Sequence, residues 1–242
     1  MCTVTYLPFG PDHFILTSNR DETTLRKPAD FPYSKSFHDK NIIYPKDGAA
    51  GGTWVAASDT NVVMCLLNGA FEKHKHEPPY RMSRGLMLME AIECIRPEEF
   101  IKNFDFQGIE PFTLLMIYKE GVRKFIEFRW DGANKYITMK DTDKPYIWSS
   151  STLYTKEVQE KREAIFQDWL KKNPSPDVFA IRDFQTQKDP QDPANSFLMK
   201  RDKGLQTVST TSIELKANKV SMVYEDHTQP GIKSLTLSVD HH

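Results

Sequence analysis

Hydrophobic and polar positions alternate at the start of the chain, as they do in β-strands. Residues 2–7 and 13–18 each predict a strand, and the segment between them, which is rich in proline and glycine, predicts a turn. If the residues next to this turn face each other, Cys2 lies opposite Ser18. The residues that follow the second strand then emerge beside the N-terminus.

A second hairpin is predicted from residues 51–58 and 62–67, and its return strand is apolar on both faces. A strand of this kind belongs to a sheet that is covered on both sides. By the same pairing, Asn68 falls opposite the pair Gly51-Gly52, where glycines let another backbone or a ligand approach closely. Residues 23–50 lie between the two hairpins, are polar and contain several prolines. They predict a long surface connection.

The remaining pattern predicts four helices and more antiparallel strands. The helices begin at Ser83, at Pro97, near Val158 and after Asp177. In the third helix, Val158, Ile165, Phe166 and Trp169 are expected to face inward. Strands are predicted at 112–118, 122–130, 136–139, 146–150, 206–215 and 219–224, with a loop at 185–204 and either an edge strand or a loose segment after 224.

This order of elements indicates the α+β class, because helices and antiparallel strands are segregated along the chain. Two stacked sheets between two helical layers would use every element, since sheets that are apolar on both faces need cover on both. No internal repeat or linker divides the 242 residues. We therefore expect a single domain spanning residues 1–242, with the second and last hairpins in different sheets.

Composition narrows the possible partners. The net charge of −1 gives no reason to expect nucleic acid or an anionic membrane surface. No apolar run reaches the length of a membrane span, and the N-terminus lacks the pattern of a secretory signal, so a cytoplasmic location is expected. Cys2, Cys65 and Cys94 have neither metal-ligand nor disulfide spacing, and the latter two are expected to be buried and inert. His74 and His76 fit a solvated loop better than a metal site. No metal or cofactor is predicted.

The first hairpin places groups for acyl-transfer chemistry together. If Met1 is removed, Cys2 carries both a thiol and a free α-amine, which can serve as the base for the thiol. Asp21 can orient the ammonium, while Arg20 can lower the pKa of the thiol or bind a substrate carboxylate. The side-chain amide of Asn68 is the candidate donor to an oxyanion.

Four short motifs carry a family resemblance. They are Met1-Cys2, Asn19-Arg20-Asp21-Glu22, Gly51-Gly52-Thr53-Trp54 and Ser83-Arg84-Gly85. Together they resemble the NRDE-motif family, also called the transport-and-Golgi-organisation family. That family looks related to N-terminal nucleophile (Ntn) hydrolases that use cysteine, such as penicillin V acylases and bile salt hydrolases.

The resemblance implies a four-layer αββα sandwich and assigns roles to individual residues. Cys2, Arg20, Asp21, Asn68 and Ser150 would form the catalytic set. Asn19, Gly52 and Arg84 would contact the substrate. These roles are carried over from the family motifs and are expectations for this chain.

The second half of the chain departs from the family pattern at two positions. The family has Ser-Asn-Ser before its long helix, whereas this chain has serine at 149, 150 and 151. Near the C-terminus the family has Gly-Thr-Arg-Ser, and here Val208 replaces the arginine. Ser150 can still donate one hydrogen bond, but Val208 has no polar group. The resemblance therefore covers residues 1–90 well and the remainder loosely.

Two functions follow from these observations. The first is an Ntn-type hydrolase that cleaves a C–N bond in a small acyl-amide substrate. The second is a non-catalytic binding protein of the same fold, which would hold an amphipathic, lipid-like or haem ligand. The sequence leaves the substrate and the oligomeric state open.

Overall fold

The computed structural model describes residues 3–37, 40–94 and 96–239, and its strands form two antiparallel sheets. The first sheet contains, in spatial order, β10 (Tyr146–Ser149), β1 (Thr3–Pro8), β2 (His13–Thr23), β11 (Leu205–Lys216), β12 (Lys219–Asp226) and β13 (Ile232–Ser238). The second contains β3 (Asp30–Phe37), β4 (Lys40–Lys46), β5 (Val55–Ser58), β6 (Val63–Asn68), β7 (Phe112–Glu120), β8 (Val122–Trp130) and β9 (Lys135–Met139).

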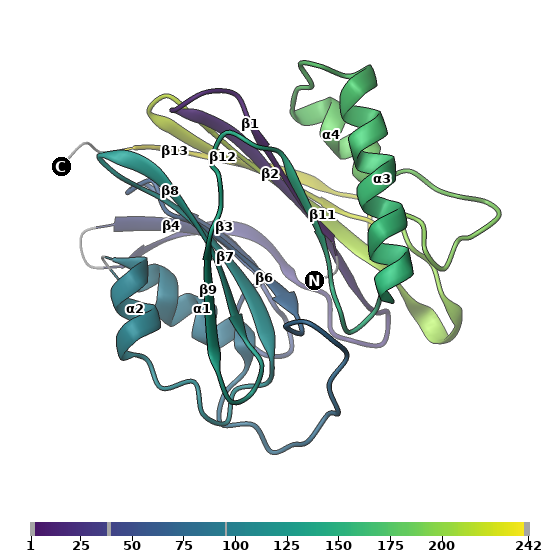
Figure 1. Cartoon of the computed structure of the whole chain (residues 1–242), viewed down its shortest axis with the longest axis horizontal. Coiled ribbons are helices and arrows are strands. Elements are labelled where there is room, and N and C mark those ends of the chain that lie inside the picture. Colours follow the sequence, from purple (N-terminus) through teal and green to yellow (C-terminus); the bar gives the residue numbers. More distant parts are fainter. Residues whose placement is uncertain (1–2, 38–39, 95, 240–242) are drawn as a thin grey trace.

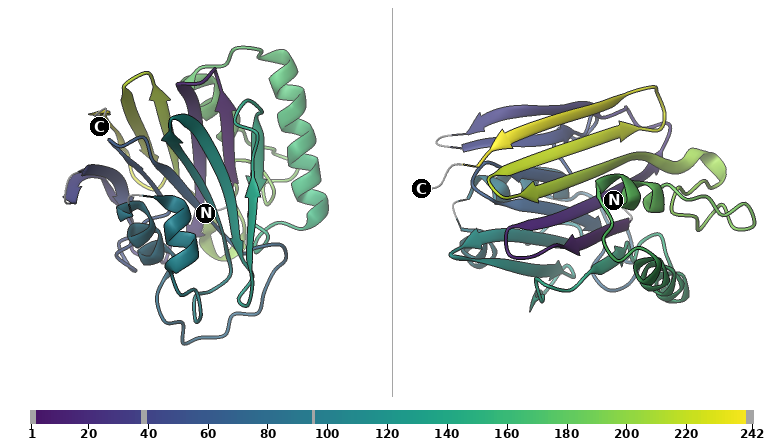
Figure 2. Two further views of the ribbon diagram at one scale, coloured as in Figure 1. Left: turned by 60° about the vertical axis from the view of Figure 1, so that its left-hand side comes forward. Right: turned by 90° about the horizontal axis from the view of Figure 1, so that it is seen from above.

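The two sheets stack between two helical layers (Figure 1, Figure 2). The second sheet is covered by α1 (Arg84–Glu93) and α2 (Pro97–Asn103), and the first by α3 (Lys156–Lys172) and α4 (Val178–Gln185). A third cluster of buried apolar side chains fills the space between the sheets. The predicted α+β class and four-layer αββα sandwich are confirmed. Among the described residues, no helix is both long and apolar enough to cross a bilayer.

The helix starts follow from local capping. Ser83 Oγ accepts a hydrogen bond from the backbone N–H of Leu86 at 3.2 Å, and Asp177 Oδ1 accepts one from Ala180 at 2.8 Å. These bonds satisfy N–H groups that have no partner inside the helix. α1 buries Met87 and its apolar neighbours against the second sheet, as predicted for its methionine-rich face.

The prediction of an irregular connection over residues 23–50 is wrong, because this segment contains β3 and β4. β4 buries Ile42, Ile43 and Tyr44 against its neighbours. β3 lies at the edge of the sheet, where exposed polar residues and the ladder irregularity around Pro32 are tolerated. Edge strands of this kind lack the apolar pattern that identifies a strand in sequence.

The predicted register of the first hairpin is also wrong, by two residues. Leu7 pairs with Ile15 and Val4 with Ser18, because β1 continues through Pro8 and shortens the turn. β2 continues to Thr23 and pairs there with β11. The second hairpin has the predicted register, with Val55 paired to Cys65.

The helix α3 begins close to the predicted start near Val158, but one of the positions expected to face inward does not. Phe166 is fully buried, whereas Ile165 is 38% exposed. The additional inward position is taken by Arg162, which is 2% exposed and stacks on Tyr154. An arginine stem can be buried when its guanidinium finds acceptors, and here it donates to the backbone carbonyl of Ser196 at 2.6 Å. The last segment forms the edge strand β13, one of the two predicted outcomes.

Candidate functional site

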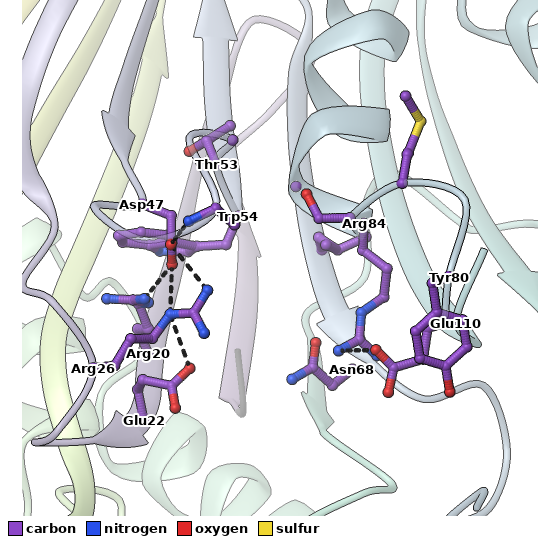
Figure 3. Close-up of a pocket in the computed structure, with 16 residues that line it drawn as sticks. Arg20, Glu22, Arg26, Asp47, Thr53, Trp54, Asn68, Tyr80, Arg84 and Glu110 are labelled. Carbon is purple, nitrogen blue, oxygen red and sulfur yellow. Dashed lines mark hydrogen bonds and ion pairs between the residues drawn. The ribbon is translucent and has the colours of Figure 1, made fainter. Parts of the chain in front are cut away.

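The candidate site lies where strand ends from both sheets approach the N-terminus of α1. It surrounds a cavity of about 380 Å³, lined among others by Arg20 of β2, Trp54, Asn68 at the end of β6 and Arg84 of α1 (Figure 3). The structure therefore brings together residues that are far apart in sequence. Cys2 lies outside the described residues. The first described residue, Thr3, pairs with Asn19, so Arg20 and Asp21 continue β2 beyond the described start of β1.

Asp21 is buried and held by two hydroxyl groups. Its Oδ2 accepts a hydrogen bond from Tyr154 Oη at 2.8 Å, and its Oδ1 accepts one from Thr207 Oγ1 at 2.6 Å. Tyr154 follows β10, whereas Thr207 lies in β11 beside a bulge in the ladder with β2. Charge-assisted hydrogen bonds of this kind fix a carboxylate in one orientation. Neither donor was identified from the sequence.

Arg20 joins the two sheets through Asp47 and Trp54. Its Nη2 donates to Asp47 Oδ2, and its guanidinium carbon lies 4.4 Å from the centre of the Trp54 ring. Arg26 binds the same carboxylate through Nε at 3.1 Å and Nη2 at 2.9 Å. Burial alone would raise the pKa of Asp47, but the bonds from Arg26, the backbone of Ala50 and the charge of Arg20 together lower it. Sequence reasoning missed Asp47 because it had placed this segment in a surface connection.

Asn68 and Ser150 are connected through the backbone. Ser150 is buried, and its Oγ donates to the carbonyl oxygen of Asn68 at 2.7 Å. Asn68 lines the cavity described above and also a second cavity of about 360 Å³ on the β10 side. Ser150 thus fixes the end of β6, from which the Asn68 amide projects.

Arg84 forms the opposite wall of the cavity with Glu110 (Figure 3). The Nη2 atom of Arg84 lies 3.0 Å from Glu110 Oε2, and Nη1 donates to the carbonyl of Pro111 at 3.0 Å. His74 and His76 lie 3.0 and 3.3 Å from Glu110 Oε1. Burial opposes ionisation of Glu110, but Arg84 and the two histidines together lower its pKa. Within the described ranges, no group of three or more His, Cys, Asp or Glu residues could hold a metal ion.

Gly52 lines the cavity, but the contact that requires a glycine is with the protein itself. A Cβ atom on Gly52 would lie 2.6 Å from the carbonyl oxygen of Gly85 and against the backbone of Leu86. The next residue, Thr53, donates its N–H to Gly85 at 3.2 Å. The absence of a side chain therefore lets α1 approach the strand, the first of the two roles expected from the sequence.

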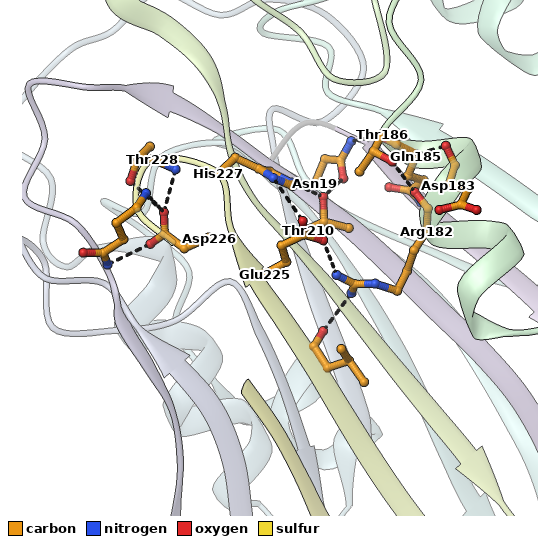
Figure 4. Close-up of polar contacts among 12 residues, drawn as sticks. Asn19, Arg182, Asp183, Gln185, Thr186, Thr210, Glu225, Asp226, His227 and Thr228 are labelled. Atoms are coloured by element: carbon orange, nitrogen blue, oxygen red, sulfur yellow. Dashed lines mark hydrogen bonds and ion pairs between the residues drawn. The ribbon is translucent and has the colours of Figure 1, made fainter. Parts of the chain in front are cut away.

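Asn19 does not line the cavity and has a structural role instead. Its Nδ2 donates to the carbonyls of Gln185 at 2.8 Å and Phe197 at 2.9 Å, and its Oδ1 accepts from Thr210 at 2.9 Å (Figure 4). His227 lies 2.8 Å from the same threonine hydroxyl. With both amide hydrogens engaged and its side chain fully buried, Asn19 has no donor left for a substrate. The expectation of a substrate contact is corrected on this ground.

Of the two described cysteines, Cys65 is buried as expected, whereas Cys94 is only half-buried. Cys65 is fully buried between the sheets, and burial raises the pKa of its thiol to about 12. Burial also raises the pKa of the Cys94 thiol. Because the thiolate is the nucleophilic form, neither is suited to catalysis at neutral pH.

Comparison with known families decides the relationship. The family model described as Transport and Golgi organisation 2 matches residues 1–153, more than half of the chain. The chain belongs to this family. No curated protein matches it in a sequence search.

Two solved structures with a similar fold are named as a hydrolase and an amidase. A mutant of conjugated bile acid hydrolase from Clostridium perfringens has a TM-score of 0.58 and 11% identity, covering 97% of this chain and 92% of its own. The Caenorhabditis elegans ortholog of N-acylethanolamine-hydrolyzing acid amidase has a TM-score of 0.57 and 13% identity, covering 88% of this chain and 92% of its own. At this identity the likeness shows the Ntn-hydrolase fold alone.

Proposed function

We propose that this member of the family is an N-terminal-cysteine hydrolase that cleaves a C–N bond in a small acylated substrate. The observation that carries the proposal is the buried Asp21, fixed by Tyr154 and Thr207 at the end of β2 beyond the pairing of Thr3 with Asn19. A buried carboxylate just beyond the described start of β1 suits a role in orienting an α-ammonium group.

The mechanism follows from these positions. Removal of Met1 frees the α-amine of Cys2, which accepts the thiol proton. The thiolate adds to the amide carbon, and the Asn68 amide donates to the resulting oxyanion. The α-ammonium then gives its proton to the departing amine, which leaves a thioester on Cys2. A water molecule, deprotonated by the same amine, hydrolyses the thioester and releases the acid and the free thiol.

The charged lining of the cavity supports this function over the alternative of lipid or haem binding. Arg20, Asp47, Arg84 and Glu110 surround the Asn68 amide with charged groups. A ligand pocket for an acyl chain or haem is lined predominantly by apolar side chains. A cytoplasmic location and a single domain over residues 1–242 are parts of the same proposal.

The test begins with the N-terminus. The intact mass should lack Met1, and iodoacetamide should label Cys2 and stop turnover of an acyl-amide panel. Cys2→Ala should abolish turnover, whereas Cys2→Ser should leave weak activity because an alkoxide is harder to form with the same base. Asp21→Asn should lower kcat in a protein that remains folded. A protein that retains Met1, leaves Cys2 unlabelled and hydrolyses no amide would instead be assigned the binding function.

A further inference from the structure

The charged side chains of the cavity stand on two facing walls (Figure 3). One wall carries Arg20, Arg26 and Asp47, and the other carries Arg84 and Glu110. The Asn68 amide lies between them. A substrate that reaches Asn68 therefore meets both walls.

The carboxylates of these walls are already occupied by protein donors. Asp47 accepts from Arg20, twice from Arg26, and from the backbone N–H groups of Ala49 and Ala50 at 3.0 and 2.7 Å. Glu110 is within 3.0 to 3.3 Å of Arg84 and the two histidines. Little acceptor capacity remains on either carboxylate for a cationic substrate group.

A third carboxylate, Glu22, stands at the same cavity and is less fully occupied. It accepts a hydrogen bond from the N–H of Thr23 at 2.9 Å and lies 3.7 Å from Arg26. Its side chain is about one-third exposed, so solvent supplies its remaining donors. Because water can satisfy its carboxylate, Glu22 adds no unpaired buried acceptor to the cavity.

The arginines, in contrast, retain unused donors. A guanidinium carries several N–H groups in a fixed fork. Among the described residues, Arg20 uses one nitrogen for Asp47 and Arg26 uses two. The Arg20 side chain is only 7% exposed. The indole Nε1 of Trp54, stacked against Arg20, is buried without a partner in the described part of the chain. The buried indole N–H has no acceptor among the described residues, and the two guanidinium groups near it carry N–H groups beyond those bound to Asp47, which together favour an anionic ligand group.

We propose, on the basis of the hydrolase function above, that the substrate carries a carboxylate that Arg20 and Arg26 bind while Asn68 faces the scissile amide. The substrate is then a small polar acyl amide and not a long-chain one. A neighbouring cavity of about 440 Å³ also borders Arg20 and Arg26 and adds Lys27, but it is not lined by Asn68. Because the scissile amide of the same substrate must reach Asn68, the substrate carboxylate is expected to bind the arginines from the cavity that Asn68 lines. A cavity of about 380 Å³ lies near the lower end of the range of about 300–1,000 Å³ for small-molecule pockets, which suits a small acyl amide.

The first test compares three anilides of known chemistry. Glutaryl p-nitroanilide has a carboxylate, its carboxamide analogue does not, and decanoyl p-nitroanilide has an apolar chain. We expect kcat/KM for the glutaryl compound to exceed both others by at least about tenfold, the usual effect of one charged hydrogen bond. Arg26→Gln should reduce this preference by a similar factor, while Arg26→Lys should retain part of it. Faster cleavage of the decanoyl compound would overturn the inference and leave the hydrolase function intact.

Lys27→Gln is the matched control, because it removes the same charge one residue away on the other cavity. It should leave both the preference and the unfolding midpoint unchanged. The two Arg26 variants disturb the contact with Asp47 and are expected to be less stable, so their kinetics are measured well below their unfolding midpoints. If Lys27→Gln abolished the preference and Arg26→Gln did not, the anion would belong to the other cavity and the inference would be wrong.

The second test does not depend on turnover. Calorimetric titration of the Cys2→Ala protein should detect binding of glutaramate, and not of glutaramide. The Arg26→Gln substitution should weaken this binding by about tenfold or more. Binding of glutaramate without hydrolysis of any anilide would support the carboxylate site and contradict the proposed reaction. Absence of glutaramate binding would overturn the carboxylate site, even in an active enzyme.

Discussion

Tyr154 donates a hydrogen bond of 2.8 Å to the buried carboxylate of Asp21, although the two residues lie 133 positions apart. The tyrosine belongs to the segment between β10 and α3, and the aspartate to β2. This bond links the strand that carries the candidate catalytic residues to the helical layer that covers it.

Replacing Tyr154 by phenylalanine tests this bond while keeping the ring that packs on Arg162. Loss of a buried hydrogen bond to a charged group should lower the free energy of unfolding by roughly 1.5–3 kcal/mol. Urea unfolding measures the change. Tyr136→Phe on the exposed strand β9 is the control and should have little effect. Equal effects of the two substitutions would contradict a special role for the Tyr154 bond.

Asp47→Asn tests the carboxylate that Arg20 and Arg26 share. Because Arg20 is mostly buried, loss of its counter-charge should destabilise the protein by about 3 kcal/mol at pH 7. Thermal or urea unfolding at neutral pH gives this value. Asp168→Asn removes an exposed carboxylate on α3 and should be nearly neutral.

The same carboxylate predicts a pH dependence. The pKa of Asp47 is lower in the folded protein than the unfolded value of about 3.9, so the unfolded chain binds more protons as the pH falls. The contribution of Asp47 to stability is therefore complete above about pH 5 and is lost as the pH falls through the folded pKa. Unfolding free energies measured from pH 6 to 2 should decline less steeply in Asp47→Asn than in the wild type. If the unfolding free energies of the two proteins fell in parallel with pH, Asp47 would not be the source of this pH dependence.

Asn68→Ala tests the oxyanion donor. If the amide donates to the tetrahedral intermediate, kcat should fall by about 10²–10³. Ser150→Ala should have a smaller effect, because Ser150 acts on the backbone carbonyl of Asn68 and not on the reacting atoms. Steady-state kinetics on any hydrolysed amide distinguish these outcomes. Asn134→Ala, in the exposed turn before β9, serves as the control.

Gly52→Ala tests the contact between the strand and α1. The added methyl group would overlap the backbone of Gly85, so we expect a loss of about 1–3 kcal/mol from overpacking. The unfolding midpoint reports it. Ala50→Ser adds one atom at a half-buried position that lines the same cavity, and it should cost less. A well-tolerated alanine would show that α1 can move away from the strand.

The elements that the sequence predicted well are those determined by local signals. The caps at Ser83 and Asp177 begin helices where expected, and the short turn after Ser58 sets the register of the second hairpin. Each depends on a few neighbouring residues. The second sheet was incomplete in the prediction because the edge strand β3 lacks an alternating apolar pattern, and prolines interrupt the segment that contains β3 and β4.

The candidate site was predicted only in part for a related reason. Successive side chains of a strand point to opposite faces. In β2, Asn19 and Asp21 face the helical layer, while Arg20 faces the second sheet. A linear motif does not show this alternation, so all three residues were expected to face one site. Asp47, Tyr154 and Thr207 are brought in only by the tertiary fold.

The contact of Arg20 with Asp47 and Trp54 has a consequence for the folding transition. Arg20 comes from one sheet, and both of its partners come from the segment that connects β4 and β5 of the other. The cavity wall therefore exists only while the two sheets are docked. Substrate binding would therefore measure the fraction of molecules in which the two sheets are in contact. Binding should be lost when the sheets separate, even if the strands within each sheet remain paired.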